Sequence, residues 1–239
     1  MTSTLSSSPV LRYQPEIERL SQEYESRSPQ ELLAWAVASF GEGLILACSF
    51  GPEDLVLIDL LTQIQPAAQA FFLDTDFHFP ETLELKAKVE QRYPQLRLHT
   101  YKPLFTPEEQ AAEYGPELYR RNPDQCCYIR KVEPMNRALQ GYQAWVTGMR
   151  RQQAATRASI GKVQWDGKRD KVKLNPLADW TDKQVWNYIH SHNLPYNVLH
   201  DRNYPSIGCF HCTAPVAPGQ DPRSGRWQGT GKTECGLHT

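Results

Sequence analysis

Between residues 43 and 148 the sequence alternates short apolar segments with longer segments of helical periodicity. Four apolar segments have the length of buried strands: 43–48, 70–74, 96–101 and 142–148. Three intervening segments have helical length and spacing: 53–64, 80–93 and 123–139. Pro80 suits the first turn of the second of these helices. Strands separated by such helices predict βαβ units, and therefore an α/β fold with a parallel sheet flanked by helices.

The segments on either side of this region have a different character. Residues 13–40 predict two helices that end at Gly41. Two further elements are expected after residue 148: a hairpin over 163–174 that turns at Asp166-Gly167, and a helix over 181–192 capped by Thr181. The last forty residues are rich in Pro, Gly, Asn and Arg and predict an irregular tail. The chain is thus expected to have three parts: N-terminal helices (1–40), a nucleotide-binding α/β domain (41–199) and a tail (200–239).

Charge and composition argue against several classes of protein. The 26 Lys and Arg residues nearly balance the 27 Asp and Glu residues, so no global field would hold a nucleic acid or an anionic membrane. The longest apolar runs are too short to span a membrane, and the first nine residues lack the features of a secretory signal. Six cysteines in such a chain favour a reducing, cytoplasmic location, where clustered thiols bind metal or do chemistry.

Two polar loops that follow neighbouring strands are candidates for nucleotide binding. The first loop opens a helix, whose N-terminus suits a phosphate or sulfate, and its candidate residues are Ser49, Phe50, Gly51, Glu53 and Asp54. The second loop, 74–82, contributes Asp74 and Thr75. For each loop an ordinary turn is an equally weighted alternative, with Asp54 as the capping residue in the first.

Four cysteines form two close pairs, Cys126-Cys127 and Cys209-x-x-Cys212. Three interpretations compete. An iron–sulfur cubane accepts adjacent cysteines readily, because each thiolate binds a different iron. A structural zinc ion is less suited, since adjacent helical residues point about 100° apart. The third alternative is buried free cysteines with a redox CxxC pair.

A further cysteine, Cys235, lies near the end of the chain between Lys232 and His238. Cationic neighbours favour the thiolate, so Cys235 is a candidate nucleophile, although an incidental free thiol is the alternative. No second cysteine is near it, so a redox reaction would need an external dithiol such as thioredoxin. Several basic residues could neutralise a bound polyanion, or else be ordinary surface charges: Lys131, Arg150, Arg151, Arg223 and Arg226.

Taken together, seven segments resemble the assimilatory sulfonucleotide reductases, which are the adenylyl-sulfate and phosphoadenylyl-sulfate reductases. The segments are SFGPED (49–54), LDTDFHFPET (73–82), CCYIRKVEP (126–134), TGMRRQQAATR (147–157), NPLADWT (175–181), SIGCFHCTAP (206–215) and KTECGLH (232–238). The resemblance covers residues 43–239 and implies a Rossmann-like adenine nucleotide α-hydrolase fold of the PP-loop type.

The resemblance also implies a two-electron reduction of activated sulfate to sulfite. In this family the four paired cysteines go with a [4Fe–4S] cluster and with adenylyl sulfate as substrate, so we expect Cys126, Cys127, Cys209 and Cys212 to be cluster ligands. Cys235 becomes the nucleophile, thioredoxin the electron donor, and the basic residues the ligands of the phosphosulfate and nucleotide.

Three alternatives remain at this point: a phosphoadenylyl-sulfate reductase, a PP-loop ligase of the ATP pyrophosphatase type, and a zinc-stabilised nucleotide sensor. Homo-oligomerisation is allowed by the sequence but not specified.

Overall fold

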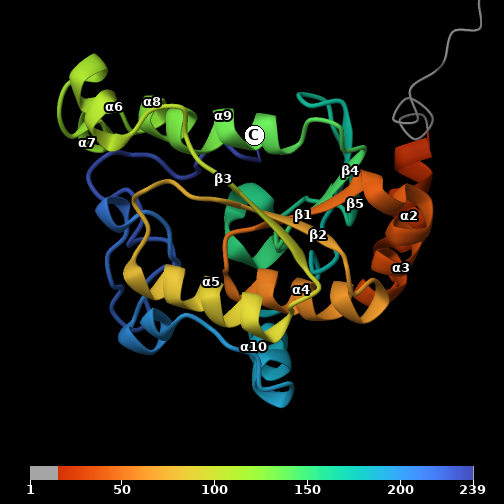
Figure 1. Ribbon diagram of the computed structural model, residues 1–239. Helices are drawn as coiled ribbons and strands as arrows, with labels where there is room; N and C mark the ends of the chain where they lie inside the picture. Colours follow the sequence, from red (N-terminus) through yellow and green to blue (C-terminus); the bar gives the residue numbers. More distant parts are fainter. Residues whose placement is uncertain (1–15, 239) are drawn as a thin grey trace, which may run out of the picture.

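The computed structural model describes residues 16–238 of the 239-residue chain, and helices flank both faces of a central sheet in this part (Figure 1). The strands are β1 (Leu44–Cys48), β2 (Gln69–Leu73), β3 (Arg97–Tyr101), β4 (Ala144–Val146), β5 (Val163–Asp166) and β6 (Lys171–Leu174). The α-helices are α2 (Ile17–Glu25), α3 (Pro29–Phe40), α4 (Pro52–Ile64), α5 (Pro80–Arg92), α6 (Pro107–Tyr114), α7 (Leu118–Arg121), α8 (Pro123–Cys127), α9 (Glu133–Ala138) and α10 (Asp182–Ser191). The predicted features of residues 1–15 lie outside the described residues.

Within the described residues the strands form a six-stranded sheet in the order β3-β2-β1-β4-β6-β5. Every neighbouring pair is parallel except β5 and β6, which are antiparallel. The predicted α/β fold with a parallel sheet is confirmed. The strand order runs outward in one direction from β1 to β3 and in the other from β4 onward, so the switch in direction lies between β1 and β4. Ligands of open α/β sheets bind at such a point, beyond the carboxyl ends of the strands.

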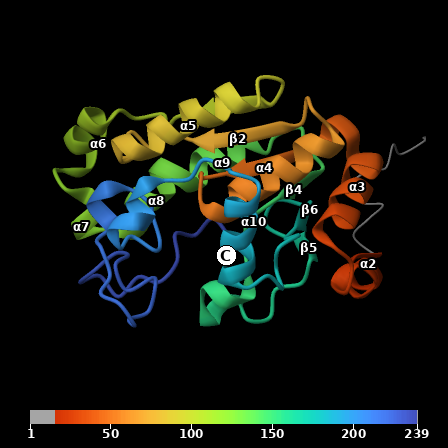
Figure 2. The ribbon, with the colours of Figure 1, turned by 90° about the horizontal axis from the view of Figure 1, so that it is seen from below.

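Alternate residues of the central strands face two different apolar layers. In β1, Leu44, Leu46 and Cys48 belong to the larger core, which α3, α4, α5 and α10 cover (Figure 2). Ile45 faces the opposite way and packs with Phe71, Trp145 and residues of α9. This two-residue alternation in a fully buried sheet is why the strands are continuous apolar runs in the sequence.

Local capping contacts mark the first or last turn of several helices. Ser28 and Glu31 form a capping box at the start of α3, and Gly41 ends this helix with a φ of +49°. Thr181 caps α10 as expected, through a hydrogen bond from the amide of Gln184. The helix ends at Gly41 and Thr181 agree with the sequence-based expectation, which did not include the Ser28–Glu31 box; each of these contacts involves residues within four positions of one another.

Three details differ from the sequence-based expectation. The helix predicted over 123–139 is interrupted between α8 and α9 by a π-helical turn, η3 (Tyr128–Val132). The hairpin closes through residues 167–170, because Asp166 pairs with Lys171, rather than turning at Asp166-Gly167. The short helices α6 and α7 lie in a segment for which the sequence patterns predict no element.

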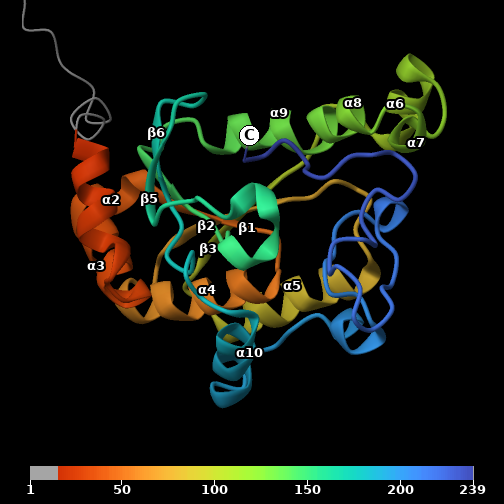
Figure 3. The same ribbon diagram turned by 180° about the vertical axis from the view of Figure 1, so that it is seen from behind.

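The tail after residue 200 is irregular, as predicted, but it is packed against the domain. Its regular structure consists of the 3₁₀ turns η6 (Val198–Arg202) and η7 (Phe210–Cys212) and of one bridge between Thr213 and Arg226. The end of the chain runs alongside α8 and α9 (Figures 1 and 3). Within residues 16–238 no helix is long and apolar enough to cross a membrane.

Candidate active site

A cavity of about 780 Å³ lies beyond the carboxyl ends of β1, β2 and β4, at the switch in strand order. The loops after these three strands line it together with the tail. The structure brings most of the predicted site residues to this cavity: Ser49, Phe50, Gly51, Glu53, Asp54, Thr75, Lys131, Arg150, Arg223, Arg226 and Cys235. Asp74, Arg151 and the four paired cysteines are not in its wall.

The loop between β1 and α4 is closed by its own acidic residue. The Asp54 carboxylate accepts hydrogen bonds from the backbone amides of Ser49 (2.7 Å) and Gly51 (3.3 Å) and from the Ser49 hydroxyl (2.8 Å). Burial is the main cause that raises the pKa of Asp54 to about 6. Asp54 thus binds the two amides that precede α4, as the capping alternative expects, and the anion-binding role of this helix N-terminus stays a prediction.

The loop after β4 approaches the first loop closely at Gly148. A Cβ atom at this position would lie 2.6 Å from Asp54 Oδ1 and 2.8 Å from Glu53 Cβ, so a side chain does not fit without a shift. This contact joins the loops that follow β1 and β4. Sequence reasoning missed it, although a glycine at the end of the predicted strand segment 142–148 was a signal for such a close approach.

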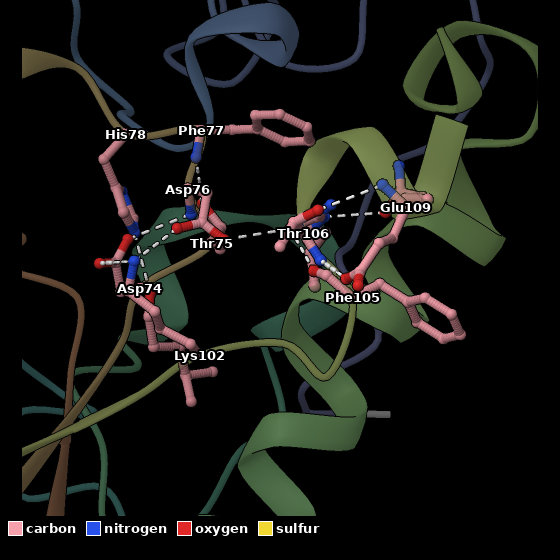
Figure 4. Close-up of polar contacts among 12 residues, drawn as sticks. Asp74, Thr75, Asp76, Phe77, His78, Lys102, Phe105, Thr106 and Glu109 are labelled. Atoms are coloured by element: carbon pink, nitrogen blue, oxygen red, sulfur yellow. Dashed lines mark hydrogen bonds and ion pairs between the residues drawn. The ribbon is translucent and has the colours of Figure 1, made fainter. Parts of the chain in front are cut away.

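Polar contacts hold the loop after β2 (Figure 4). Asp74 accepts a hydrogen bond from the amide of Asp76 at 3.1 Å, and Lys102 pairs with both carboxylates, at 3.5 Å and 2.7 Å. Asp74 therefore stabilises the loop and is not among the residues that line the cavity, so its role in substrate binding stays a prediction. Thr75 is buried and its hydroxyl lies 3.5 Å from Cys209 Sγ, so this loop also contacts the paired cysteines.

The paired cysteines share one environment beside the cavity. Cys126 and Cys127 end α8, Cys209 precedes η7 and Cys212 is its last residue. Burial, followed by the charges of the other three thiols, raises the pKa of Cys126 to about 12. Burial and the charges of Cys209 and Cys127 similarly raise the pKa of Cys212 to about 11. The structure thus brings together two pairs that are about 80 residues apart in the sequence.

The four thiols are a donor set that a [4Fe–4S] cluster could use. Among the described residues, no group of three or more His, Cys, Asp or Glu side chains is arranged to hold a metal ion. A single zinc ion draws its sulfurs together at about 2.3 Å each, whereas a cubane holds each thiolate on a different iron. Donors to sulfur are also present, since the Gln110 amide lies 4.0 Å from Cys126 Sγ and Thr75 is near Cys209.

The π-helical turn after Cys127 sends two cations in different directions. Arg130 is fully buried over the Phe77 ring at 4.8 Å and binds Asp76 at 3.2 Å. Lys131 lines the cavity instead. Burial acts to lower the pKa of Lys131, but the charges of the Cys209, Cys235 and Cys127 thiols outweigh it and raise the pKa. Lys131 therefore lies between the paired cysteines and Cys235.

The predicted arginines have different environments. Arg150 is buried and binds Glu53 at 2.7 Å and Asp182 at 3.1 Å, so its charge is largely compensated within the protein. Arg151 is not among the residues that line the cavity and pairs with Glu25 at 2.6 Å, so its substrate contact stays a prediction. Arg150 has extended backbone and Arg151 begins the 3₁₀ turn η4 (Arg151–Gln153), so the two neighbours have different local conformations.

Two tail arginines are oriented by the buried ring of Trp227. The guanidinium carbons of Arg226 and Arg223 lie 4.5 Å and 5.6 Å from the ring centroid. Arg226 also donates to the Ser206 hydroxyl at 3.1 Å and fills the space beside Gly208, where a Cβ atom would lie 2.2 Å from Arg226 Nη2. Both arginines therefore reach the cavity from a fixed support.

The segment around Cys235 is docked by contacts on both sides. Arg157 and Arg223 bind the carboxylate of Glu234, and the His238 ring stacks on Trp145 with a centroid distance of 5.7 Å. Leu237 packs against the smaller core, beside α9. Cys235 itself is half-buried in the cavity wall. Arg157, Glu234 and His238 were not among the predicted site residues, although all three lie within the motifs that carry the resemblance.

Comparison with known proteins places this arrangement in a family. The model of the phosphoadenosine phosphosulfate reductase domain matches residues 43–215. The chain belongs to this family. The sequence-based assignment to the sulfonucleotide reductases is thereby confirmed, and with it the assignment to an enzyme class that reduces a sulfur group.

Two curated members of the reductase family illustrate the similarity. A protein of Gloeobacter violaceus named phosphoadenosine 5'-phosphosulfate reductase is 58% identical over 227 residues, which cover 94% of each chain. A protein of Shouchella clausii named adenosine 5'-phosphosulfate reductase is 53% identical over 221 residues, which cover 92% of each chain. The two names differ in the nucleotide that they specify.

Solved structures support the same assignment. The phosphoadenylyl-sulfate reductase of Candida auris, in a phosphate complex, has a TM-score of 0.75 and 36% identity, covering 89% of this chain and all of that one. The FMN adenylyltransferase of Candida glabrata, with a TM-score of 0.56 and 17% identity over 90% of this chain and 70% of that one, shares the fold alone. The predicted Rossmann-like PP-loop fold is consistent with both.

Proposed function

We propose that the chain reduces adenylyl sulfate to sulfite and AMP in assimilatory sulfate reduction, with thioredoxin as electron donor. The observation that carries the proposal is the place of Cys235, which the docked tail holds in a cavity whose wall includes Lys131, Arg223 and Arg226. Proteins named adenosine 5'-phosphosulfate reductase, with 48–53% identity to this chain, support adenylyl sulfate as the substrate.

Different parts of the cavity wall are assigned to different parts of the bound nucleotide. The loop 49–54 is acidic and closed by Asp54, so we assign it to the ribose and base rather than to the phosphosulfate. The phosphosulfate is assigned to the other cations of the wall: Lys131, Arg226, whose Nε has no hydrogen-bond partner, and Arg223, which also binds Glu234. Arg150 and Thr75 complete the wall, while Asp74 and Arg151 act outside it by holding their own segments.

The chemistry needs only thiols for its electrons. The Cys235 thiolate attacks the sulfur of the sulfate group, the bond from that sulfur to the bridging oxygen breaks, and AMP leaves. The product is S-sulfocysteine at position 235. A thioredoxin thiolate then attacks Cys235 Sγ, sulfite leaves with the bonding pair, and the second thioredoxin thiol reduces the mixed disulfide. One dithiol is oxidised for each sulfite released, so the electrons balance.

A [4Fe–4S] cluster is proposed as the resident cofactor, held by Cys126, Cys127, Cys209 and Cys212. When bound, it supplies a fixed group of charges beside Lys131, without carrying the reducing electrons. The neighbours of these cysteines, Thr75 and Gln110, offer hydrogen bonds to sulfur. Broad absorbance near 400 nm in anaerobically purified protein tests this part, whereas a colourless, zinc-loaded and inactive protein supports the nucleotide sensor instead.

A phosphoadenylyl-sulfate reductase is the second candidate, favoured by the name of the Gloeobacter violaceus relative. Anaerobic assays of sulfite release with each nucleotide and reduced thioredoxin separate the two. Mass spectrometry of the protein mixed with adenylyl sulfate, without reductant, tests the mechanism: an SO₃ adduct is expected on Cys235. A PP-loop ligase would instead require an acceptor and keep its activity without Cys235. The three-part division of the chain, a cytoplasmic location and self-association stay predictions.

A further inference from the structure

The carboxylate of Glu234, the residue before Cys235, is bound on both of its oxygens. Arg157 donates from Nε to one oxygen at 2.9 Å and from Nη2 to the other at 2.8 Å. Arg223 adds a contact at 3.2 Å, and the Thr156 hydroxyl adds one at 3.3 Å. The side chains of Glu234 and Arg157 are only 14% and 10% exposed, so this is a two-point ion pair largely shielded from water.

Hydrogen bonds hold Arg157 to the loop that follows the carboxyl end of β4. Its remaining terminal nitrogen, Nη1, donates to Gln153 Oε1 at 2.5 Å, and Gln153 also binds the amide of Arg150 and the carbonyl of Gly148. These residues follow β4, at the switch in strand order. Arg157 therefore presents its guanidinium from a supported position, and Glu234 attaches the tail to it.

The tail near Cys235 has little other regular support. The backbone between residues 231 and 238 forms no helix or strand, so side-chain contacts decide where Cys235 Sγ lies. Lys232 binds Asp124 on α8, and Leu237 packs beside α9. Of these contacts, that of Glu234 is nearest to Cys235 in the sequence, because Glu234 directly precedes it. Its loss could displace Cys235 Sγ, and a displacement of about 1 Å at a reacting atom can lower the rate about a hundredfold.

A carboxylate beside the nucleophile also needs neutralising. An unpaired Glu234 would repel both the Cys235 thiolate and an anionic substrate. Burial acts to raise the pKa of Glu234, but the hydrogen bonds and charges of Arg157 and Arg223 outweigh it and lower the pKa. The pair thus provides an anchor for the tail without adding a free negative charge next to Cys235.

We propose that Glu234 is a positioning residue, which sets Cys235 for attack on the bound anhydride through its ion pair with Arg157. The inference rests on the proposed function, because it concerns the same thiolate. It adds a requirement that the tail motif be held by a specific acid. A glutamine at this position keeps the size of the side chain and removes the charge, whereas an aspartate keeps the charge on a shorter arm.

The test compares the wild type with Glu234→Gln and Glu234→Asp. The matched control is Glu25→Gln. This variant removes the acidic partner of Arg151, an arginine in the same loop as Arg157, and Glu25 does not line the cavity. Two quantities are measured: the single-turnover rate of S-sulfocysteine formation against adenylyl sulfate concentration, and the rate at which trypsin cleaves after Lys232 to release the end of the chain. The second does not depend on turnover.

For Glu234→Gln, we expect the saturated rate of adduct formation to fall at least about tenfold, while the half-saturating concentration changes less than about threefold. Release by trypsin should accelerate, Glu234→Asp should recover part of both effects, and Glu25→Gln should behave as the wild type. An unchanged adduct rate, unchanged trypsin release, or a loss confined to the half-saturating concentration would overturn the inference. A wild type that forms no adduct would instead overturn the proposed function.

Discussion

The two sides of the cavity are held in different ways. The loop 49–54 is fixed by backbone amides that bind Asp54 and by the close approach of Gly148. The opposite side, around Cys235, is held by side chains from distant parts of the chain, chiefly Arg157 with Glu234 and Lys232 with Asp124. Under the proposed mechanism, this difference gives a fixed cradle for the nucleotide on one side and, on the other, a nucleophile on an arm that can open to an electron donor.

Of the changes considered, replacing Cys235 should lower the activity most. Cys235→Ser is expected to reduce sulfite release at least about a thousandfold, because a hydroxyl at this position is a poor nucleophile and cannot enter thiol exchange. The midpoint of thermal unfolding should stay close to that of the wild type, since Cys235 is half-buried and outside the apolar cores. Normal turnover by this variant would refute the assignment of Cys235.

A methyl group at Gly148 should disturb the cradle. Gly148→Ala places a Cβ atom 2.6 Å from Asp54 Oδ1, so we expect the free energy of unfolding to fall by up to about 3 kcal/mol. Denaturant unfolding measures the loss. Gly167→Ala is the control, because its Cβ atom would meet Trp165 at an ordinary 3.9 Å. Equal stability of the two variants would show that the loops are not held by this contact.

The cradle should also respond to pH through Asp54. Burial raises the pKa of Asp54 from 3.8 to about 6, so the folded state holds the proton more tightly than the unfolded chain. The stabilising contribution is therefore present below the unfolded pKa and is lost as the pH rises through about 6. Relative to Asp54→Asn, the wild type should lose about 2 kcal/mol of unfolding free energy between pH 4 and 7. Urea titrations at both pH values check this, and parallel profiles for the two proteins would contradict it.

The smallest effect is expected at the ion pair between Lys232 of the tail and Asp124 of α8. Asp124 has an 83% exposed side chain, so its pair with Lys232 should contribute at most about 1 kcal/mol. For Asp124→Asn we expect trypsin release after Lys232 to rise by less than about fivefold at low salt, with the difference vanishing at high salt. If Asp124→Asn accelerated trypsin release as much as Glu234→Gln, the Lys232–Asp124 and Arg157–Glu234 ion pairs would act as one unit.

The sequence predicts those features that depend on near neighbours along the chain. The alternation of buried strands with helices indicates the parallel sheet, and Gly41 and Thr181 mark helix ends through contacts within a few residues. Seven segments taken together, including those around Cys126, Cys209 and Cys235, indicate the reductase family, and the family model matches residues 43–215. Local patterns suffice here because each preference involves residues only a few positions apart.

Only the tertiary structure decides which of these residues meet. Asp54 fills the loop expected to bind an anion, and Arg151 turns to Glu25 while its neighbour Arg150 lines the cavity. Arg157 and Glu234, which are 77 positions apart, form the ion pair beside the nucleophile. The direction of a charged side chain depends on the partners that the folded chain brings within hydrogen-bond distance, and a one-dimensional pattern contains no such distances.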